Sequence, residues 1–251
     1  MAFFVGMPHQ AHTNANFHWD DRAESGPTFS LSTSAPIDPA NLPTSATRTR
    51  GKQLPDIFPM PGFNAVSERF RALVERFEPN THFFHPVVLK EKDGSQAGGP
   101  HYIFSARVAL DCILLARSGI AWQQHDGHAP FPDFRFGSWE THPPAHPKSR
   151  ARQEAKHGIA AYAAARGILV EAPRHLQVSR PAIEGHHLWT GAHFLFQGLW
   201  LSDAFYRAFE QERIKYLMSH AHGFEIDEPW LADRELAPLA AWREAQGRSR
   251  S

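Results

Sequence analysis

Cysteine is almost missing from the sequence, since Cys112 is the only one among 251 residues. A single cysteine excludes an internal disulfide and a zinc site built from several thiolates, so we expect a reducing compartment. Cys112 lies inside an apolar run. We therefore expect a buried structural thiol there and not a nucleophile.

Glycine-rich phosphate loops are absent as well. Neither G-x-G-x-x-G nor the Walker-type G-x-x-x-x-G-K-[ST] occurs, and the sequence has no G-x-S-x-G nucleophile elbow and no H-E-x-x-H motif. The commonest signatures of nucleotide binding and hydrolysis are thus missing. We therefore predict a binding protein with no cofactor and no enzymatic activity.

Long apolar runs and an excess of one charge are also lacking. No stretch approaches the length of a membrane span, and the N-terminal "MAFFVGMPHQ" has neither the basic region nor the apolar stretch of an export signal. Lys plus Arg and Asp plus Glu both number 26, which is not the charge pattern of a nucleic-acid binder. We expect a soluble, cytoplasmic protein without a direct nucleic-acid or membrane partner.

Aromatic residues, prolines and glycines are plentiful. The chain has 19 Phe, 7 Trp, 20 Pro and 17 Gly, and its hydrophobic share of 42% is ordinary for a globular protein. This composition predicts a core built on rings and many turns between short elements. With no internal repeat and no sign of a second complete core, we predict one α+β domain, with a mostly antiparallel sheet and a few packed helices.

The clearest helical signal is "SERFRALVERFEP" at residues 67–79. Val66, Phe70, Leu73, Val74 and Phe77 recur at helical spacing and predict one buried face. The serine that opens the stretch is a good N-cap, and the proline that closes it cannot continue a helix. We expect this face to belong to the core. The glutamates at 75 and 78 are expected to make hydrogen bonds at the helix end first and to contact a partner second.

Other elements are predicted along the chain. Residues 2–6 read as an opening strand, about 20–55 as an extended connection, and 101–115 as one long strand or a strand that runs into a short helix. Further strands are predicted near residues 134–139, 188, 194–201 and 214–219, and an alanine-rich helix at 148–168. Ser202 is expected to cap a helix, and we expect the main domain to span residues 1–225, followed by a short helix and tail at 226–251.

The 17 histidines leave a second function open, that of a metal-dependent hydrolase. His186 and His187 are adjacent with Glu184 nearby, and His220 and His222 would face the same side of a strand. Three histidines and a carboxylate can form a hydrolytic metal site. Pairs at this spacing also arise by chance in so histidine-rich a chain, so surface or packing roles are the simpler interpretation.

Several short motifs, taken in order, are similar to a family of bacterial immunity proteins. "LPDIF" at 54–58 precedes the helix above, and "HFFHPVVL" and "HYIFSARVALD" follow it. Later, "IEGHHLW" at 183–189 and "LWLSDAFYRAF" again fit the pattern. The chain resembles the type first described from a myxobacterial protein and found beside polymorphic toxins. The alanine-rich helix and the tail depart from that pattern.

This resemblance implies an antidote. Such proteins bind a cognate toxin, often a nuclease delivered by contact-dependent or type VI secretion, and they block it. The resemblance supplies no catalytic residues. The implied partner is therefore the toxin, and neither a metal nor a cofactor is expected.

Candidate contact residues come from the residues themselves and not from the resemblance. Large aromatics mixed with charges in a loop-like segment suit a specific interface. This segment holds Trp122, His125, Asp126, Asp133, Arg135, Trp139 and Glu140. A second candidate is the acidic cluster Glu225, Asp227 and Glu228, which would suit a toxin with a basic substrate groove. Buried rings and a solvated acidic turn are the alternative interpretations.

Overall fold

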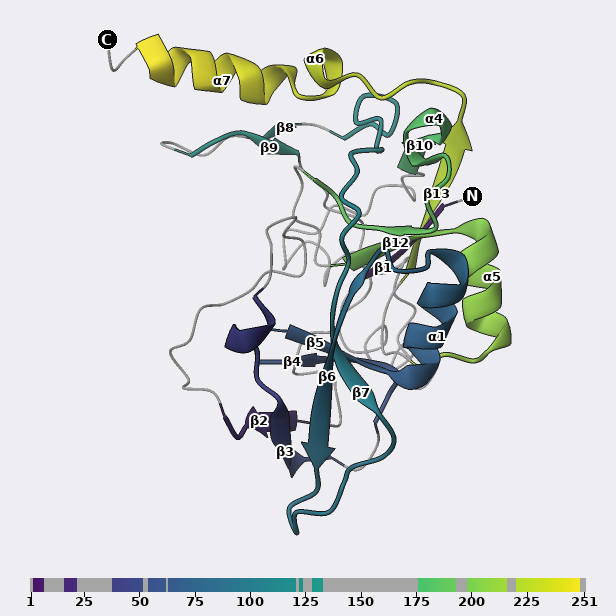
Figure 1. The fold of residues 1–251 in the computed structure, drawn as a ribbon. Coiled ribbons are helices and arrows are strands. Elements are labelled where there is room, and N and C mark those ends of the chain that lie inside the picture. Colours follow the sequence, from purple (N-terminus) through teal and green to yellow (C-terminus); the bar gives the residue numbers. More distant parts are fainter. Residues whose placement is uncertain are drawn as a thin grey trace, which may run out of the picture. The chain divides into compact units, whose positions relative to one another are not determined.

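The computed structural model describes residues 2–6, 16–21, 38–51, 54–61, 63–120, 122–123, 128–132, 176–192, 198–215 and 220–248 (Figure 1). Most neighbouring strands are antiparallel, and helices pack against the sheets. This confirms the predicted single α+β domain. The predicted strand at 134–139 and the alanine-rich helix at 148–168 lie outside the described residues.

Two compact units can be distinguished within this fold. Unit 1 comprises Met1–Ala2, Asp111–Glu184 and Ser219–Ser251, and unit 2 comprises Phe3–Leu110 and Gly185–Met218. Both units are therefore discontinuous in sequence. The predicted boundary between a main domain ending at residue 225 and a tail stays a prediction. No helix in the described part of the chain has the length and apolar character to cross a membrane.

Unit 2 is built on a six-stranded sheet. Its strands lie in the order β2 (Asn16–Trp19), β3 (Ser45–Arg50), β6 (Phe83–Lys90), β7 (His101–Ser105), β5 (Phe63–Ser67) and β4 (Ile57–Met60). Only β3 and β6 run parallel. The outermost strands β2 and β4 also contact each other, so the sheet curves around a core.

The strand β3 lies within the expected extended connection, which also contains the short 3-10 turn η2 (Pro39–Asn41). Its sequence "SATRTR" is polar and gives only a weak strand signal. The side chains nevertheless alternate, because Ala46 and Arg48 are buried while Ser45 and Thr47 are half-buried. Pairing with β2 on one side and β6 on the other stabilises a strand that propensity alone does not reveal.

Two capped helices cover part of the sheet in unit 2, and they lie side by side (Figure 1). They are α1 (Glu68–Phe77) and α5 (Asp203–Gln211). Ser67 accepts a hydrogen bond from the Phe70 N–H, and Ser202 accepts one from the Phe205 N–H, so both predicted N-caps are confirmed. The prediction that Val66 belongs to the helix was wrong, since it lies in β5, yet it enters the same core as Phe70.

Unit 2 has a second core, which contains Phe70 and lies between α1, α5 and the strands. Aromatic rings dominate it, as the composition predicted. Phe70 meets Phe104 edge-on at 5.5 Å and Phe209 edge-on at 6.3 Å between ring centroids. The strands β1 (Ala2–Gly6), β12 (Gly198–Ser202) and β11 (Leu188–Trp189) are neighbours in this order, and Phe3, Leu188 and Leu201 join the same cluster.

The segment at 101–115 is neither a single strand nor a strand followed by a helix, so both predicted alternatives were wrong. The strand β7 ends at Ser105. Beyond it, Ala109 forms an isolated bridge with Thr190, and Ile113 forms another with Val178. The apolar side chains of this stretch suit a buried position. Its backbone pairs first with Thr190 and then with Val178, so no continuous strand forms. Ile214 and Lys215 likewise form no strand, and 216–219 lie outside the described residues.

Unit 1 holds the parallel pair β10 (Leu176–Ser179) and β13 (His220–Ile226) and the small antiparallel pair β8 (Trp122–Gln123) and β9 (Phe131–Pro132). The helices among its described residues are α4 (Arg180–Ile183), α6 (Ala232–Glu235) and α7 (Ala237–Arg248). The last two confirm the predicted helix near the end of the chain. Cys112 is buried in this unit, as predicted for a structural thiol.

Candidate partner-binding site

The candidate residues near the middle of the chain fall mainly outside the described part. Trp122 is described: it lies in β8, half-buried, opposite Pro132 of β9. Phe131 in β9 is exposed. The other residues proposed from this segment lie outside the described residues, namely His125, Asp126, Asp133, Arg135, Trp139 and Glu140. Their part in an interface stays a prediction.

The acidic cluster lies where β13 ends and the chain turns toward α6. Its three carboxylates differ in their surroundings. Asp227 keeps 75% of its side chain exposed although Oδ1 lies 2.6 Å from Nη1 of Arg180. Glu225 lies 3.7 Å from the Nε of the same arginine. Arg180 opens α4 directly after β10, so the parallel pairing of β10 with β13 brings these charges together.

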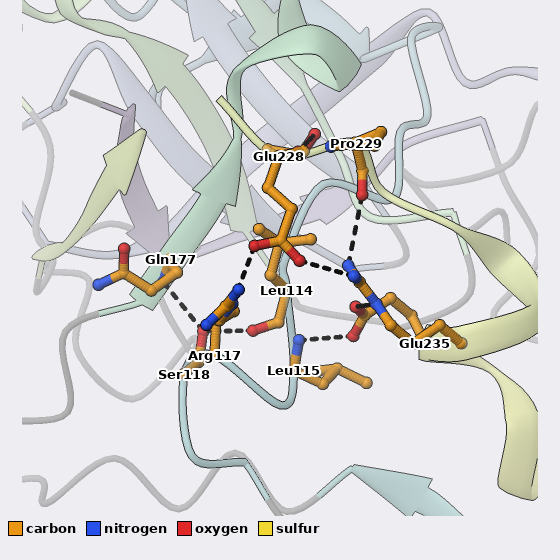
Figure 2. Close-up of polar contacts among 10 residues, drawn as sticks. Leu114, Leu115, Arg117, Ser118, Gln177, Glu228, Pro229 and Glu235 are labelled. Carbon is orange, nitrogen blue, oxygen red and sulfur yellow. Dashed lines mark hydrogen bonds and ion pairs between the residues drawn. The ribbon is translucent and has the colours of Figure 1, made fainter. Parts of the chain in front are cut away.

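Glu228 is held by two arginines and is largely covered (Figure 2). Its Oε2 accepts from Nε of Arg117 at 2.8 Å, and its Oε1 accepts from Nη1 of Arg234 at 2.6 Å. The hydrogen bond from Arg117 is the main reason that the pKa of Glu228 lies below its ordinary value, and Arg234 adds to the effect. The carboxylate of Glu228 is thus occupied by contacts within the chain.

Glu235 extends this arrangement into the interior of unit 1. It is buried, and its carboxylate accepts from the Leu115 N–H and from Nε of Arg234, each at 2.8 Å (Figure 2). Arg234 therefore bridges Glu228 and Glu235, and it also donates to the Pro229 carbonyl at 3.3 Å. The backbone between these acids is consequently fixed at both of its ends.

The turn that supplies Arg117 is itself anchored. The Ser118 hydroxyl donates to the Leu114 carbonyl at 2.8 Å and accepts from the Gln177 N–H at 2.9 Å (Figure 2). The Ser179 hydroxyl donates to the Glu228 carbonyl at 2.6 Å. Three segments far apart in sequence are thereby joined, and no local pattern of residues indicated this network.

The histidines proposed as metal ligands have other partners where they are described. His187 places its Nδ1 2.8 Å from the Ser202 hydroxyl, and its N–H donates to Glu78 at 2.6 Å. His186 lies 4.0 Å from the same glutamate. His220 and His222 lie in β13, but their side chains are not among those described. The described residues contain no group of three His, Cys, Asp or Glu that could hold a metal ion.

Glu78, at the C-cap of α1, is a buried carboxylate with several donors. It accepts from Nε2 of His82 and from the N–H groups of His187 and Leu188. Burial would raise the pKa of Glu78, but these hydrogen bonds outweigh it, and the pKa lies below its ordinary value. Nδ1 of His82 accepts from the Arg107 N–H, so the ring proton is on Nε2, facing Glu78.

The two glutamates of the α1 end were expected to make hydrogen bonds there, and this is confirmed. Glu75 accepts from the Asn80 N–H at 2.9 Å, where Asn80 has a φ of 56°. Glu78 reaches further along the chain, to the backbone N–H groups of His187 and Leu188 at the start of β11. Both carboxylates therefore stabilise the structure locally. Glu78 is too buried to serve as a partner contact.

Exposed apolar side chains were not foreseen as site residues. Among the described residues, the large hydrophobic side chains classed as exposed are Val88 at 49%, Phe131 at 39%, Phe224 at 38% and Leu231 at 45%. Phe131, Phe224 and Leu231 belong to unit 1. Phe224 and Leu231 stand on either side of the acidic cluster. An apolar residue bordering a run of charges was a signal that could have drawn attention to them.

Comparison with known proteins gives a partial match to a family. No curated protein matches the chain. The model of the immunity protein family (Imm11) matches residues 18–138. The match includes "LPDIF", the helix α1 and the strands β6 and β7, whereas "IEGHHLW" and everything after it lie beyond it. Over residues 18–138, the chain is therefore similar to the immunity protein family (Imm11).

Proposed function

We propose that this protein is an antidote that binds a cognate bacterial toxin and neutralises it in a stoichiometric complex. The observation that carries the proposal is the match of residues 18–138 to the immunity protein family (Imm11). The protein acts by binding and not by catalysis. It does so in the cytoplasm, either by covering the active site of the toxin or by clamping it at a distance.

The finer features of this function are also proposals. The toxin is delivered by contact-dependent or type VI secretion, and it is a nuclease, so the antidote serves competition between bacteria. The acidic turn after β13 supports a nuclease partner, because a toxin that binds nucleic acid presents a basic groove. Trp122 and the other aromatic and charged residues up to Glu140 remain candidates for the same interface.

Rescue of growth tests the proposal. The C-terminal toxin domain encoded by the gene beside that of this protein is expressed in a bacterial host, with and without the full chain. We expect arrest without the protein, growth with it, and a one-to-one complex in size-exclusion chromatography. An inactivated toxin domain is the control for the burden of expression. Arrest that persists in the presence of folded protein, with no complex formed, contradicts the proposal for that pair.

A further inference from the structure

We infer that the cognate toxin docks on residues 224–231 of unit 1, with Phe224 and Leu231 as apolar anchors and Asp227 beside them. This inference rests on the proposed function and specifies where the complex forms. Its partner is a toxin surface with an apolar hollow bordered by lysines or arginines.

Apolar exposure is the first observation behind it. Leu231 is 45% exposed and Phe224 is 38% exposed, and they lie seven residues apart on one short segment. Exposure of such side chains to water is unfavourable, and their burial in a complex lowers the free energy. Large apolar side chains with polar neighbours are typical of interface anchors.

The fixed backbone is the second observation. Ser179 donates to the Glu228 carbonyl. Arg117 and Arg234 hold the Glu228 carboxylate, and Arg234 also reaches the Pro229 carbonyl (Figure 2). A segment that is already ordered loses little conformational entropy when a partner binds. Glu228 thus positions the segment, while Leu231 and Asp227 stay exposed, the latter although it pairs with Arg180.

Charge indicates the chemistry of that partner. Five carboxylates and one arginine lie between residues 225 and 235, and Arg117 and Arg180 add two positive charges by pairing with them. Two negative charges therefore remain on this segment. Asp227 keeps 75% of its side chain exposed although it pairs with Arg180, so it can also face a cationic surface.

Position along the chain is the third observation. The family match ends at residue 138, so β13 and the turn after it lie outside the part of the chain that the family model covers. A surface that distinguishes one toxin from another suits a segment of this kind. The matched part contains most of the six-stranded sheet and α1 of unit 2, and the anchoring turn with Arg117.

Binding by single variants tests the inference. The probe is the C-terminal toxin domain of the neighbouring gene, inactivated in its active site, and it is titrated against the full chain in a calorimeter. We expect Leu231→Ser and Phe224→Ser each to weaken binding by roughly tenfold or more. Val88→Ser, which replaces an equally exposed apolar residue in unit 2, is the matched control and should bind as the wild type does.

Asp227→Asn adds a kinetic test of the charge. We expect slower association and a weaker dependence of the association rate on salt, because the carboxylate attracts a cationic partner. Melting temperatures of all variants establish that each one is folded. Hydrogen exchange of the wild-type chain with the probe gives an independent footprint, and we expect protection at residues 224–231.

The two failures are distinguishable. A wild-type chain that neither binds the probe nor rescues growth overturns the proposed function and the docking site with it. A wild-type chain that binds, while the Phe224 and Leu231 variants bind equally well and residues 224–231 gain no protection, overturns the docking site alone. Loss of binding in the Val88 variant alone would move the interface to β6.

Discussion

At the scale of single residues, Glu78 has a larger role than its position suggests. It ends α1, accepts a hydrogen bond from Nε2 of His82, and accepts the backbone N–H groups of His187 and Leu188 where β11 begins. A buried carboxylate is stable only when its hydrogen bonds replace the water it has lost. The helix end and the β11 strand of unit 2 are therefore tied through one side chain.

Replacement of Glu78 by Gln should destabilise the protein by about 1–3 kcal/mol, because an amide cannot accept all of these hydrogen bonds. Chemical denaturation of the two proteins measures the difference. Glu75→Gln is the matched control, since that side chain is more exposed and accepts one hydrogen bond. Equal losses in the two variants would contradict the role assigned to Glu78.

The same comparison has a pH dependence. The pKa of Glu78 is lowered in the folded state, so its contribution to stability is present above the ordinary value of 4.5 and is lost as the pH falls through the folded pKa. We expect the difference between wild type and Glu78→Gln to be largest near neutral pH and to shrink in acid. A difference that grows on acidification would reverse the sign and refute the assignment.

At the scale of the elements, caps decide where the two helices of unit 2 begin. The Ser67 hydroxyl accepts from the Phe70 N–H and donates to Oδ1 of Asp56 at 2.6 Å. Asp56 in turn accepts from the Lys215 N–H at 2.7 Å. The start of α1 is thus connected through Asp56 to the chain that follows α5.

Ser67→Ala should therefore cost about 1–2 kcal/mol, at the upper end for an N-cap, because it also removes a donor from Asp56. Thermal and chemical denaturation measure this loss. Ser95→Ala, in an exposed turn where the hydroxyl bonds to Asp93, is the control and should change stability little. A neutral Ser67→Ala would show that Asp56 holds α1 without the serine.

At the scale of the whole molecule, contacts between distant segments hold each unit together. In unit 1, Glu235 receives the Leu115 N–H across 120 residues of sequence. Glu235→Ala leaves that N–H and Arg234 without their buried acceptor. We expect faster hydrogen exchange at Leu115 and through α6, measured by mass spectrometry. The exposed neighbour Asp233→Ala is the control, and equal exchange in both variants would argue against this anchor.

Local patterns explain how much of the molecule could be predicted. The helix α1, both serine caps, the aromatic core and the buried Cys112 follow from spacing and residue type. The strand β3 and the changes of partner beyond Ser105 do not, because they depend on pairing with distant segments. For the candidate site, the acidic residues were visible in the sequence. The arginines that occupy Glu228 come from residues 117 and 234, and no local pattern could have shown them.

The division of unit 1 along the chain has a consequence for its synthesis. Its strand β10 pairs with β13, and β13 follows the last residue of unit 2. A ribosome therefore completes all of unit 2 before it makes the partner strand of β10, Arg234 or Glu235. Every nascent chain passes through a stage in which Arg117 has no carboxylate from residue 228 to meet, and unit 1 is the later of the two units to become complete.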